Sequence, residues 1–347
     1  MGMVNIRIKI YIIIKMEYKN MSFTLLLLVT LSILILIKIF VWRICPFVYQ
    51  YFIMCENKIK ELYSSEKSKN PWVLITGASG GMGKRFAIEF YNRGFNLFLI
   101  GTKRINDVSK DFDKNRIILL EKDFSQSFEK DFFNDIESTI EKLGLDFTVL
   151  INNVGYRTGW TVYEDMPLEE IKKTISVGTL VQSRLIQLAI KNFSKRNKMG
   201  LGSAILNITA QCYFPTDLFS VSNHVTVPYL ACYEASNAFG FYQAKSVYDE
   251  IKHKYPLIDF LIITPGAVLT ENTRDELEST MFSVDVNIYV KNIIKLLGNL
   301  NGVRSAYWGH SLSGALINIF PFVNTEKILA ETGYDLALSK QNKIKAI

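Results

Sequence analysis

The sequence has few cysteines, no internal repeat and no tract of low complexity. Its 347 residues contain four cysteines, and no two of these have the spacing of metal ligands or of a dense disulfide framework. We therefore expect no metal centre, and reduced thiols in a domain that faces the cytosol. The length fits one large α/β domain with appendages.

The chain also lacks a basic stripe on its presumed folded part. Of the net charge of +7, residues 1–70 carry a surplus of +6, from 10 Lys/Arg against 4 Asp/Glu. A basic surplus that flanks an apolar segment favours anionic lipid over nucleic acid as the partner. The charge pattern therefore predicts a lipid membrane as a partner and no nucleic-acid binding.

One long apolar run lies near the N-terminus. The segment "MSFTLLLLVTLSILILI" carries no charge, and with Lys38 and the following residues it reaches Trp42. These 22 residues would form about 33 Å of helix, enough to span a hydrocarbon core of about 30 Å. The run is long for a signal peptide and no small-residue cleavage site follows it, which favours a retained anchor. Similar Lys/Arg counts on both sides leave the orientation open.

The chain divides around this anchor into several predicted parts. Residues 44–54 are rich in aromatic side chains that fit the membrane interface, and residues 56–70 are polar like a linker. The predicted parts are an N-terminal tail (1–20), a transmembrane anchor (21–43), an interfacial segment and linker (44–70), a cofactor-binding domain (71–300), a C-terminal apolar segment (301–335) and a basic tail (336–347).

Beyond residue 71, short apolar runs alternate with helical stretches. The runs are "WVLIT", "NLFLIG", "RIILLEKDF", "FTVLINNVG", "AILNITA" and "DFLIITPG". Continuous apolar strands between helices predict a parallel sheet that is covered on both faces. We therefore expect an α/β fold, a Rossmann-like doubly wound parallel sheet, with an N-terminal transmembrane helix.

A glycine-rich turn follows the first run. Thr76, Gly77, Gly81 and Gly83 form the pattern T-G-x-x-x-G-x-G, with Ser79 and Met82 inside it. Glycines allow the tight turn and the close approach of the backbone to a pyrophosphate, which then lies at the N-terminus of the next helix. Because a strand precedes the pattern and a helix follows it, we interpret it as a dinucleotide site.

The end of the second strand indicates which dinucleotide binds. Sites for NAD usually place an acid there, whereas this chain has Gly101, Thr102, Lys103 and Arg104. Two cations suit a 2′-phosphate, so we predict NADP(H). The alternative is that both cations are only solvated surface charges.

These residues resemble the short-chain dehydrogenase/reductase superfamily over roughly residues 70–335. The branch of membrane-bound very-long-chain 3-oxoacyl-CoA reductases and 17β-hydroxysteroid dehydrogenases is similar in its anchor and in "AYWGHSLSGALINIFPF", residues 306–322. The resemblance implies an NADP(H)-dependent oxidoreductase of lipid metabolism. It also implies further cofactor residues: Asp123 for the adenine ring, Asn152, Val154 and Gly155 in N-N-x-G, and Pro265, Gly266, Val268 and Thr270 around the nicotinamide.

The catalytic positions depart from the family pattern of Asn, Ser, Tyr and Lys. Tyr233 matches the tyrosine and would be both proton donor and a cofactor contact, but Asn237 replaces the lysine. The best register puts Gly178 at the asparagine, and Thr209 and Ala210 at the serine, with Thr209 a weak carbonyl partner. Ser220 or Ser222, in the long polar and aromatic loop 211–230, are further alternatives for the serine.

Loss of the lysine leaves two functions open. A free phenol has a pKa near 10, and a neighbouring ammonium lowers it toward physiological pH. The first function is a membrane-anchored reductase of a lipid carbonyl, such as a 3-oxoacyl-CoA or a steroid. The alternative is a catalytically silent member that binds NADP(H) and acts as a scaffold or regulatory subunit.

The C-terminus ends in "KIKAI", which resembles a dilysine retrieval signal through Lys343 and Lys345. Such a signal works only in the cytosol. We therefore expect a single-pass protein of the endoplasmic reticulum membrane with its domain facing the cytosol; a lumenal domain is the alternative. Family members commonly associate through the helices that flank the tyrosine, which implies a homo-oligomer.

Overall fold

The computed structural model describes residues 23–102, 104–210, 227–271, 273–274, 279–319, 331 and 334–335. It divides the chain into two compact units, Met1–Met54 and Cys55–Ile347.

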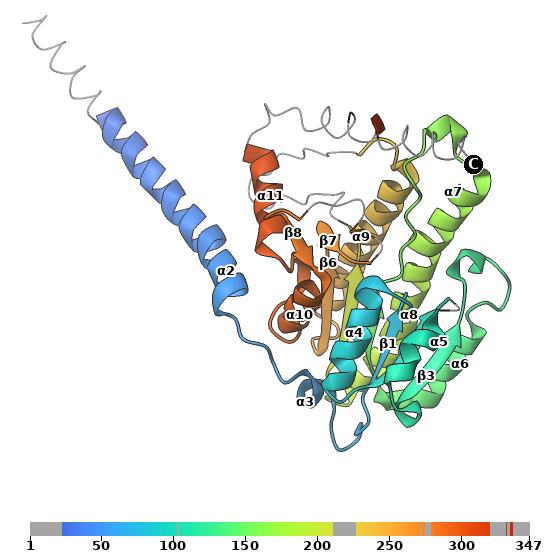
Figure 1. The fold of residues 1–347 in the computed structure, drawn as a ribbon. Coiled ribbons are helices and arrows are strands. Elements are labelled where there is room, and N and C mark those ends of the chain that lie inside the picture. The colour runs from blue at the N-terminus through green and yellow to red at the C-terminus, as the bar shows by residue number, and fades with distance from the viewer. Residues whose placement is uncertain are drawn as a thin grey trace, which may run out of the picture. The chain divides into compact units, whose positions relative to one another are not determined.

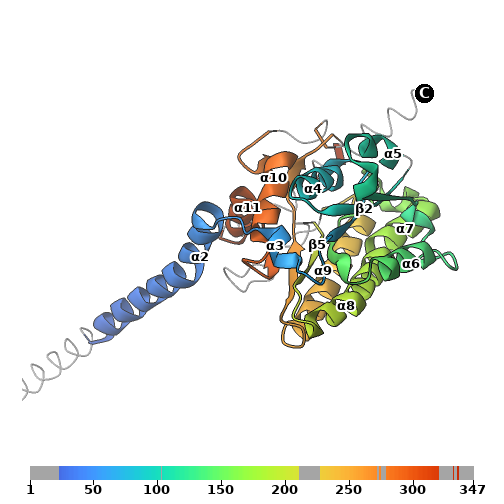
Figure 2. The ribbon, with the colours of Figure 1, turned by 90° about the horizontal axis from the view of Figure 1, so that it is seen from below.

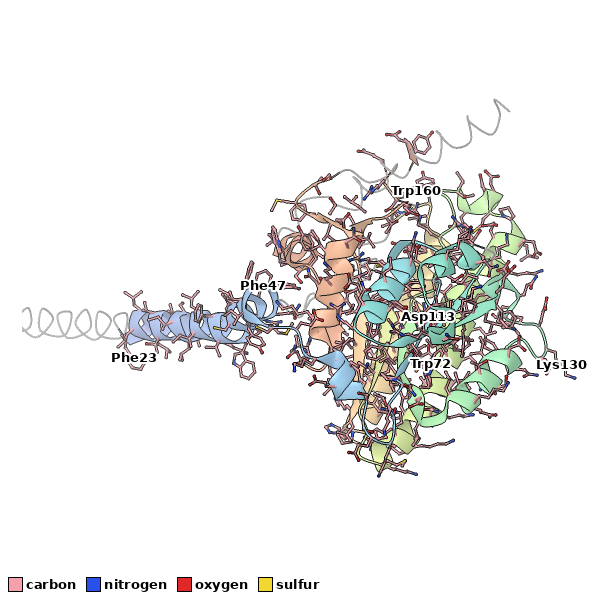
Figure 3. The ribbon with its side chains drawn as sticks, turned by 60° about the horizontal axis from the view of Figure 1, so that its bottom comes forward. Phe23, Phe47, Trp72, Asp113, Lys130 and Trp160 are labelled. Atoms are coloured by element: carbon pink, nitrogen blue, oxygen red, sulfur yellow. The ribbon has the colours of Figure 1, made fainter. Side chains whose placement is uncertain are left out.

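The first unit is built around one long apolar helix, Phe23–Ile53. The helix has 31 residues and a mean hydropathy of 2.8, and its length and composition suffice to cross a membrane. Its large apolar side chains are exposed, and Figure 3 shows them projecting from the helix between the labelled Phe23 and Phe47. The helix continues past the predicted anchor limit at residue 43, through a short α-helical turn, α2 (Cys45–Val48), between two π-helical turns.

The second unit contains a seven-stranded parallel sheet, as Figure 1 shows. The strand order is β3-β2-β1-β4-β5-β6-β9. The strands are β1 (Trp72–Thr76), β2 (Asn96–Gly101), β3 (Ile117–Glu121), β4 (Phe147–Asn152), β5 (Ser203–Ile208), β6 (Ile258–Ile263) and β9 (Gly302–Arg304). The six predicted strands are all present, and the predicted doubly wound fold is confirmed.

Helices cover both faces of this sheet, as Figure 2 shows from below. One layer holds α4 (Gly81–Asn92), α5 (Ile105–Val108) and α10 (Val286–Leu296). The other layer holds α6 (Asn134–Leu143), α7 (Leu168–Ile175), α8 (Gln182–Lys198) and α9 (Ala231–Ile251). Because side chains on both faces of the central strands are buried, the strands read as continuous apolar runs in the sequence.

Two short strands form a separate parallel pair, β7 (Ala267–Leu269) with β8 (Ser283–Asp285). They lie in the segment that links β6 to α10. The last described helix is α11 (Trp308–Ile319), at the start of the predicted C-terminal apolar segment.

The segment expected to be a polar linker is partly packed against the domain. A short helix, α3 (Ile59–Tyr63), buries Ile59 and Tyr63. The fully buried guanidinium of Arg196 donates hydrogen bonds to the carbonyl of Tyr63 and to the hydroxyl of Ser68. Tyr63 itself donates to Asp259 at 2.7 Å. Residues 59–68 therefore belong to the folded unit, because their polar groups complete its hydrogen bonds.

Candidate functional site

The glycine loop lies at the carboxyl end of β1, from which the strand order proceeds through β2 and β3 on one side and through β4 and β5 on the other. This is the switch point at which open α/β sheets bind ligands. Gly77, directly after β1, has φ +66°, and Gly81, at the start of α4, has φ +52°. Both lie in the left-handed region that favours glycine, so the sequence pattern and the backbone agree.

Close packing explains why position 83, the third glycine of the pattern, must be a glycine. A Cβ atom on Gly83 would lie 2.2 Å from the carbonyl oxygen of Gly77, so no other residue fits there. In contrast, a Cβ on Gly80 would meet nothing within 4 Å, and one on Gly81 would meet only Thr270, at 3.8 Å. The loop is therefore tight toward its own helix and open on its outer side. A backbone surface of this kind fits a pyrophosphate.

The other residues of the motif fix the loop to the sheet. The Thr76 hydroxyl accepts the backbone N–H groups of Asn153 and Val154, both at 3.0 Å. Ser79 packs against Gly101, where a Cβ would lie 2.2 Å from the serine Oγ. Met82 is half-buried at the start of α4. These contacts hold the carboxyl ends of β1, β2 and β4 together.

The two ends of the N-N-x-G element lie in different surroundings, Asn152 in the interior and Gly155 at the surface. The Asn152 side chain is fully buried and donates to Asn207 Oδ1 at 3.0 Å and to the Gln182 carbonyl at 3.1 Å. It therefore connects the sheet to α8. Gly155 is exposed, and a Cβ there would meet nothing within 4 Å. This leaves the backbone at Gly155 open to a cofactor.

Two of the residues that are predicted to contact the adenosine half of the cofactor are charged and exposed. Asp123 is exposed, and one carboxylate oxygen accepts the backbone N–H of Ser125 at 2.9 Å. Arg104 is exposed directly before α5. Lys103 lies outside the described residues. The carboxylate of Asp123 has a second oxygen that can accept a hydrogen bond, and the guanidinium of Arg104 can donate to an anion.

The predicted nicotinamide loop, Pro265–Thr270, contains β7 and ends beside the glycine loop. Val268 is buried in β7, and its carbonyl accepts the hydroxyl of Thr273 at 2.7 Å. The same hydroxyl accepts the backbone N–H of Thr270 at 2.9 Å. Thr270 approaches the position that a Cβ on Gly81 would take, so the two loops face each other.

The predicted proton donor is on the first turn of α9. Tyr233 is half-buried there. Its carbonyl oxygen accepts two side chains from the same helix, Ser236 Oγ at 2.8 Å and Asn237 Nδ2 at 2.9 Å. Asn237 is therefore folded back on its own helix, whereas the longer lysine of the family pattern would reach beyond it.

The helix that carries Gly178 is interrupted by a π-helical segment, Ser176–Val181. Segments of this kind are frequent at functional sites. Gly178 is buried, and a Cβ there would lie 2.7 Å from both Cβ and Oγ of Ser236. The glycine therefore lets this helix approach α9 three residues beyond Tyr233, and an asparagine at 178 would require Ser236 to move.

Thr209, the weak candidate for a carbonyl partner, is turned toward the sheet. Its buried hydroxyl donates to the carbonyl of Ile263 at 3.2 Å. A hydroxyl that donates there cannot donate the same hydrogen to a substrate. Ala210 next to it is buried and offers only a methyl group. Ser220 and Ser222 lie outside the described residues.

The sequence reading missed Glu234, next to Tyr233. Its carboxylate accepts the backbone N–H of Val227 at 2.8 Å. Burial raises the pKa of Glu234 to about 7, against the smaller opposing effect of that hydrogen bond. No sequence pattern marks such an acid, because its raised pKa comes from burial in the folded protein. Among the described residues, no three His, Cys, Asp or Glu side chains cluster to hold a metal.

Comparisons with known proteins identify the family of this chain. The family profile of short chain dehydrogenase matches residues 71–280. The very-long-chain 3-oxoacyl-CoA reductase of Mus musculus is 28% identical over 260 residues, which cover 72% of this chain and 75% of the mouse protein. The human 17-beta-hydroxysteroid dehydrogenase type 3 is 26% identical over 264 residues, which cover 74% and 77%.

Solved structures support the fold. The 3-ketoacyl-(acyl-carrier-protein) reductase from Brucella melitensis complexed with NADH has a TM-score of 0.55 at 19% identity, covering 68% of this chain and 95% of that one. A short-chain dehydrogenase from Sphingobium yanoikuyae in complex with NADPH has a TM-score of 0.54 at 20% identity, covering 73% and 95%. With the glycine loop, the sheet order and Tyr233 in place, this chain belongs to the short chain dehydrogenase family, as an oxidoreductase related to the very-long-chain 3-oxoacyl-CoA reductases.

Proposed function

We propose that this chain is a membrane-anchored NADP(H)-dependent oxidoreductase of a lipid carbonyl or hydroxyl, of the 3-oxoacyl-CoA or steroid kind. The observation that carries the proposal is a glycine loop in a conformation suited to a pyrophosphate, together with Tyr233 on the first turn of α9. The lipid substrate is supported by the names of the relatives, which act on acyl-CoA and steroid substrates.

The cofactor would lie across the carboxyl end of the sheet. The backbone from Gly77 to Gly83 would hold the pyrophosphate, Asp123 the adenine ring, and Arg104 with Lys103 the 2′-phosphate. The loop from Pro265 to Thr270 would hold the nicotinamide. When bound, the cofactor supplies or accepts the hydride at the substrate carbon.

In the direction of reduction, Tyr233 donates the proton. Its Oη–H bond breaks as the carbonyl oxygen of the substrate takes the proton, and the phenolate then recovers a proton from water. An ammonium about 4 Å away would stabilise that phenolate by about 4 kcal/mol at an effective dielectric near 20. Asn237 cannot supply this charge, and its amide already donates to the Tyr233 carbonyl. We therefore expect turnover up to about a thousandfold slower than with a lysine.

The second candidate function is a catalytically silent NADP(H)-binding scaffold or regulatory subunit. Two observations favour it. Asn237 is folded back on α9, and the described residues at the expected serine offer a methyl from Ala210 and a hydroxyl from Thr209 that already donates to Ile263. Cofactor binding is common to both functions, so only turnover separates them.

The deciding experiment measures turnover with purified full-length protein in detergent. NADPH consumption is followed with a long-chain 3-oxoacyl-CoA, and NADPH binding is titrated in the same preparation. We expect slow consumption that Tyr233→Phe removes while the affinity for NADPH is retained. Tyr242→Phe, on the exposed part of the same helix, is the matched control and leaves the rate unchanged. Binding without consumption would establish the scaffold instead.

A gain-of-function variant tests the role of the missing charge. Asn237→Lys places an ammonium one helical turn from Tyr233 and gives up only the hydrogen bond to the helix carbonyl. We expect the residual rate to rise by at least tenfold, with a pH optimum shifted toward neutrality. An unchanged rate with retained cofactor binding would show that the lysine is not what limits this site.

We further propose that the protein spans the endoplasmic reticulum membrane once, with its domain in the cytosol. The helix Phe23–Ile53 supports a single span, while Lys343 and Lys345 lie outside the described residues. Protease treatment of intact microsomes tests the orientation: residues 71–347 are expected to be digested without detergent. Protection until detergent is added would place the domain in the lumen.

A further inference from the structure

His310 lies at the start of the C-terminal apolar segment, in α11. Its imidazole is 1% exposed and packs between two aromatic rings, Tyr289 of α10 at 5.3 Å and Tyr307 at 5.2 Å between ring centroids. A buried polar ring of this kind needs partners for its nitrogen atoms.

Both ring nitrogens are bonded to the loop assigned to the nicotinamide. Nδ1 accepts the backbone N–H of Gly266 at 3.2 Å. Nε2 lies 3.2 Å from the carbonyl oxygen of Ala267. Because Nδ1 is an acceptor, Nε2 must carry the hydrogen and donate it to that carbonyl. Burial lowers the pKa of His310 to about 4, so the ring keeps this neutral form at physiological pH.

These two bonds attach the first part of the loop to α11. Pro265 has no backbone N–H, so Gly266 provides the first donor of the loop. The strand that follows, β7, pairs with β8 and is not part of the seven-stranded sheet. His310 therefore connects this part of the loop to α11 and, through its ring contact with Tyr289, to α10.

We propose that His310 is a positioning residue, which fixes the Gly266–Ala267 backbone and thereby orients the nicotinamide half of the cofactor. The proposal rests on the proposed function, because it assumes that the Pro265–Thr270 loop contacts the cofactor. It also links the C-terminal apolar segment to the reacting end of the site, since His310 belongs to that segment.

The first test separates the two halves of the cofactor. His310→Phe keeps an aromatic ring between Tyr289 and Tyr307 but removes both hydrogen bonds. We expect NADPH to bind about 10-fold to 100-fold more weakly, while adenosine 2′,5′-bisphosphate, which lacks the nicotinamide, binds as before. His310→Gln offers one acceptor and one donor on a planar group and is expected to restore most of the affinity. His253→Phe, at an exposed histidine, is the matched control.

The second test needs no cofactor. Hydrogen exchange of full-length protein in detergent follows peptides that contain residues 265–270 and, as an internal control, residues 77–83. We expect His310→Phe to accelerate exchange of the first peptide by about tenfold or more, with the second unchanged. Unaltered exchange at residues 265–270 would overturn the proposal.

The outcomes distinguish a failure of the proposed function from a failure of the positioning role of His310. If the unaltered protein binds neither NADPH nor adenosine 2′,5′-bisphosphate, the proposed function fails, and the exchange data alone decide whether His310 fixes the loop. If His310→Phe weakens both ligands equally, or if His310→Gln gives no rescue, the positioning role of His310 fails while cofactor binding stands.

Discussion

Replacing Gly83 with alanine should abolish most cofactor binding by displacing the glycine loop. A Cβ at this position would lie 2.2 Å from the Gly77 carbonyl oxygen and 2.7 Å from its carbonyl carbon. Both atoms belong to the backbone and cannot rotate away. To restore ordinary contact at 3.4 Å, the loop and α4 must separate by 1.2 Å, the difference between 3.4 and 2.2 Å.

This shift of the glycine loop determines how much cofactor binding should weaken. An N–H···O bond of about 2.9 Å to a phosphate would stretch past the limit of about 3.5 Å at which it counts as a hydrogen bond. A bond to a charged group contributes about 1.5–3 kcal/mol. The loss of two of them costs about 3–6 kcal/mol, which weakens binding about 10²-fold to 10⁴-fold.

The assay is a fluorescence titration of full-length protein with NADPH. Gly202→Ala is the matched control outside the glycine loop, since a Cβ there would also meet a backbone oxygen, that of Leu62 at 2.8 Å. We expect Gly202→Ala to bind NADPH nearly as the unaltered protein does. Circular dichroism and thermal melting confirm that both variants fold. A folded Gly83→Ala protein that binds within about threefold of the original would refute the reasoning.

Three further outcomes are expected. The pKa of Glu234 in the folded state is raised, to about 7 from 4.5, so its contribution to stability is complete below pH 4.5 and is lost as the pH rises through 7. Glu234→Gln should therefore raise the melting temperature more at pH 8 than at pH 5. An equal change at both pH values would contradict the burial argument. Arg196→Lys should lower the free energy of unfolding in urea by about 2–4 kcal/mol and expose residues 59–68 to proteases, because the hydrogen bonds to Tyr63 and Ser68 are lost. Unchanged cleavage would show that other contacts hold this segment. Arg104→Glu should weaken NADPH about tenfold or more while sparing NADH, and equal losses would remove Arg104 from the 2′-phosphate site.

Much of the fold was predictable because its signals are local. Each central strand is buried on both faces, so each appears as an unbroken apolar run, and the six predicted strands were found. The strands that the sequence did not predict, the pair β7 and β8 and the edge strand β9, have three residues each, too few for such a signal. β9 is a strand because β6 offers it an edge to pair with.

The cofactor loop was predictable for the same reason. Gly77 and Gly81 are required by their own backbone angles, which a sequence pattern records directly. The assignment of Asn152 was less complete, because its side chain points into the protein and bonds Asn207 and the backbone of α8. Sequence identifies such an asparagine but not the direction of its amide.

The sequence by itself determined the doubly wound sheet, the glycine loop and the apolar N-terminal helix, since each follows from a residue and its near neighbours. Only the tertiary structure decided what surrounds the reacting end. The contact of Gly178 with Ser236, the burial of Glu234 and the bonds from His310 to Gly266 and Ala267 join residues that are 7 to 58 positions apart. Their chemistry comes from packing and desolvation across helices and loops, which local sequence does not encode.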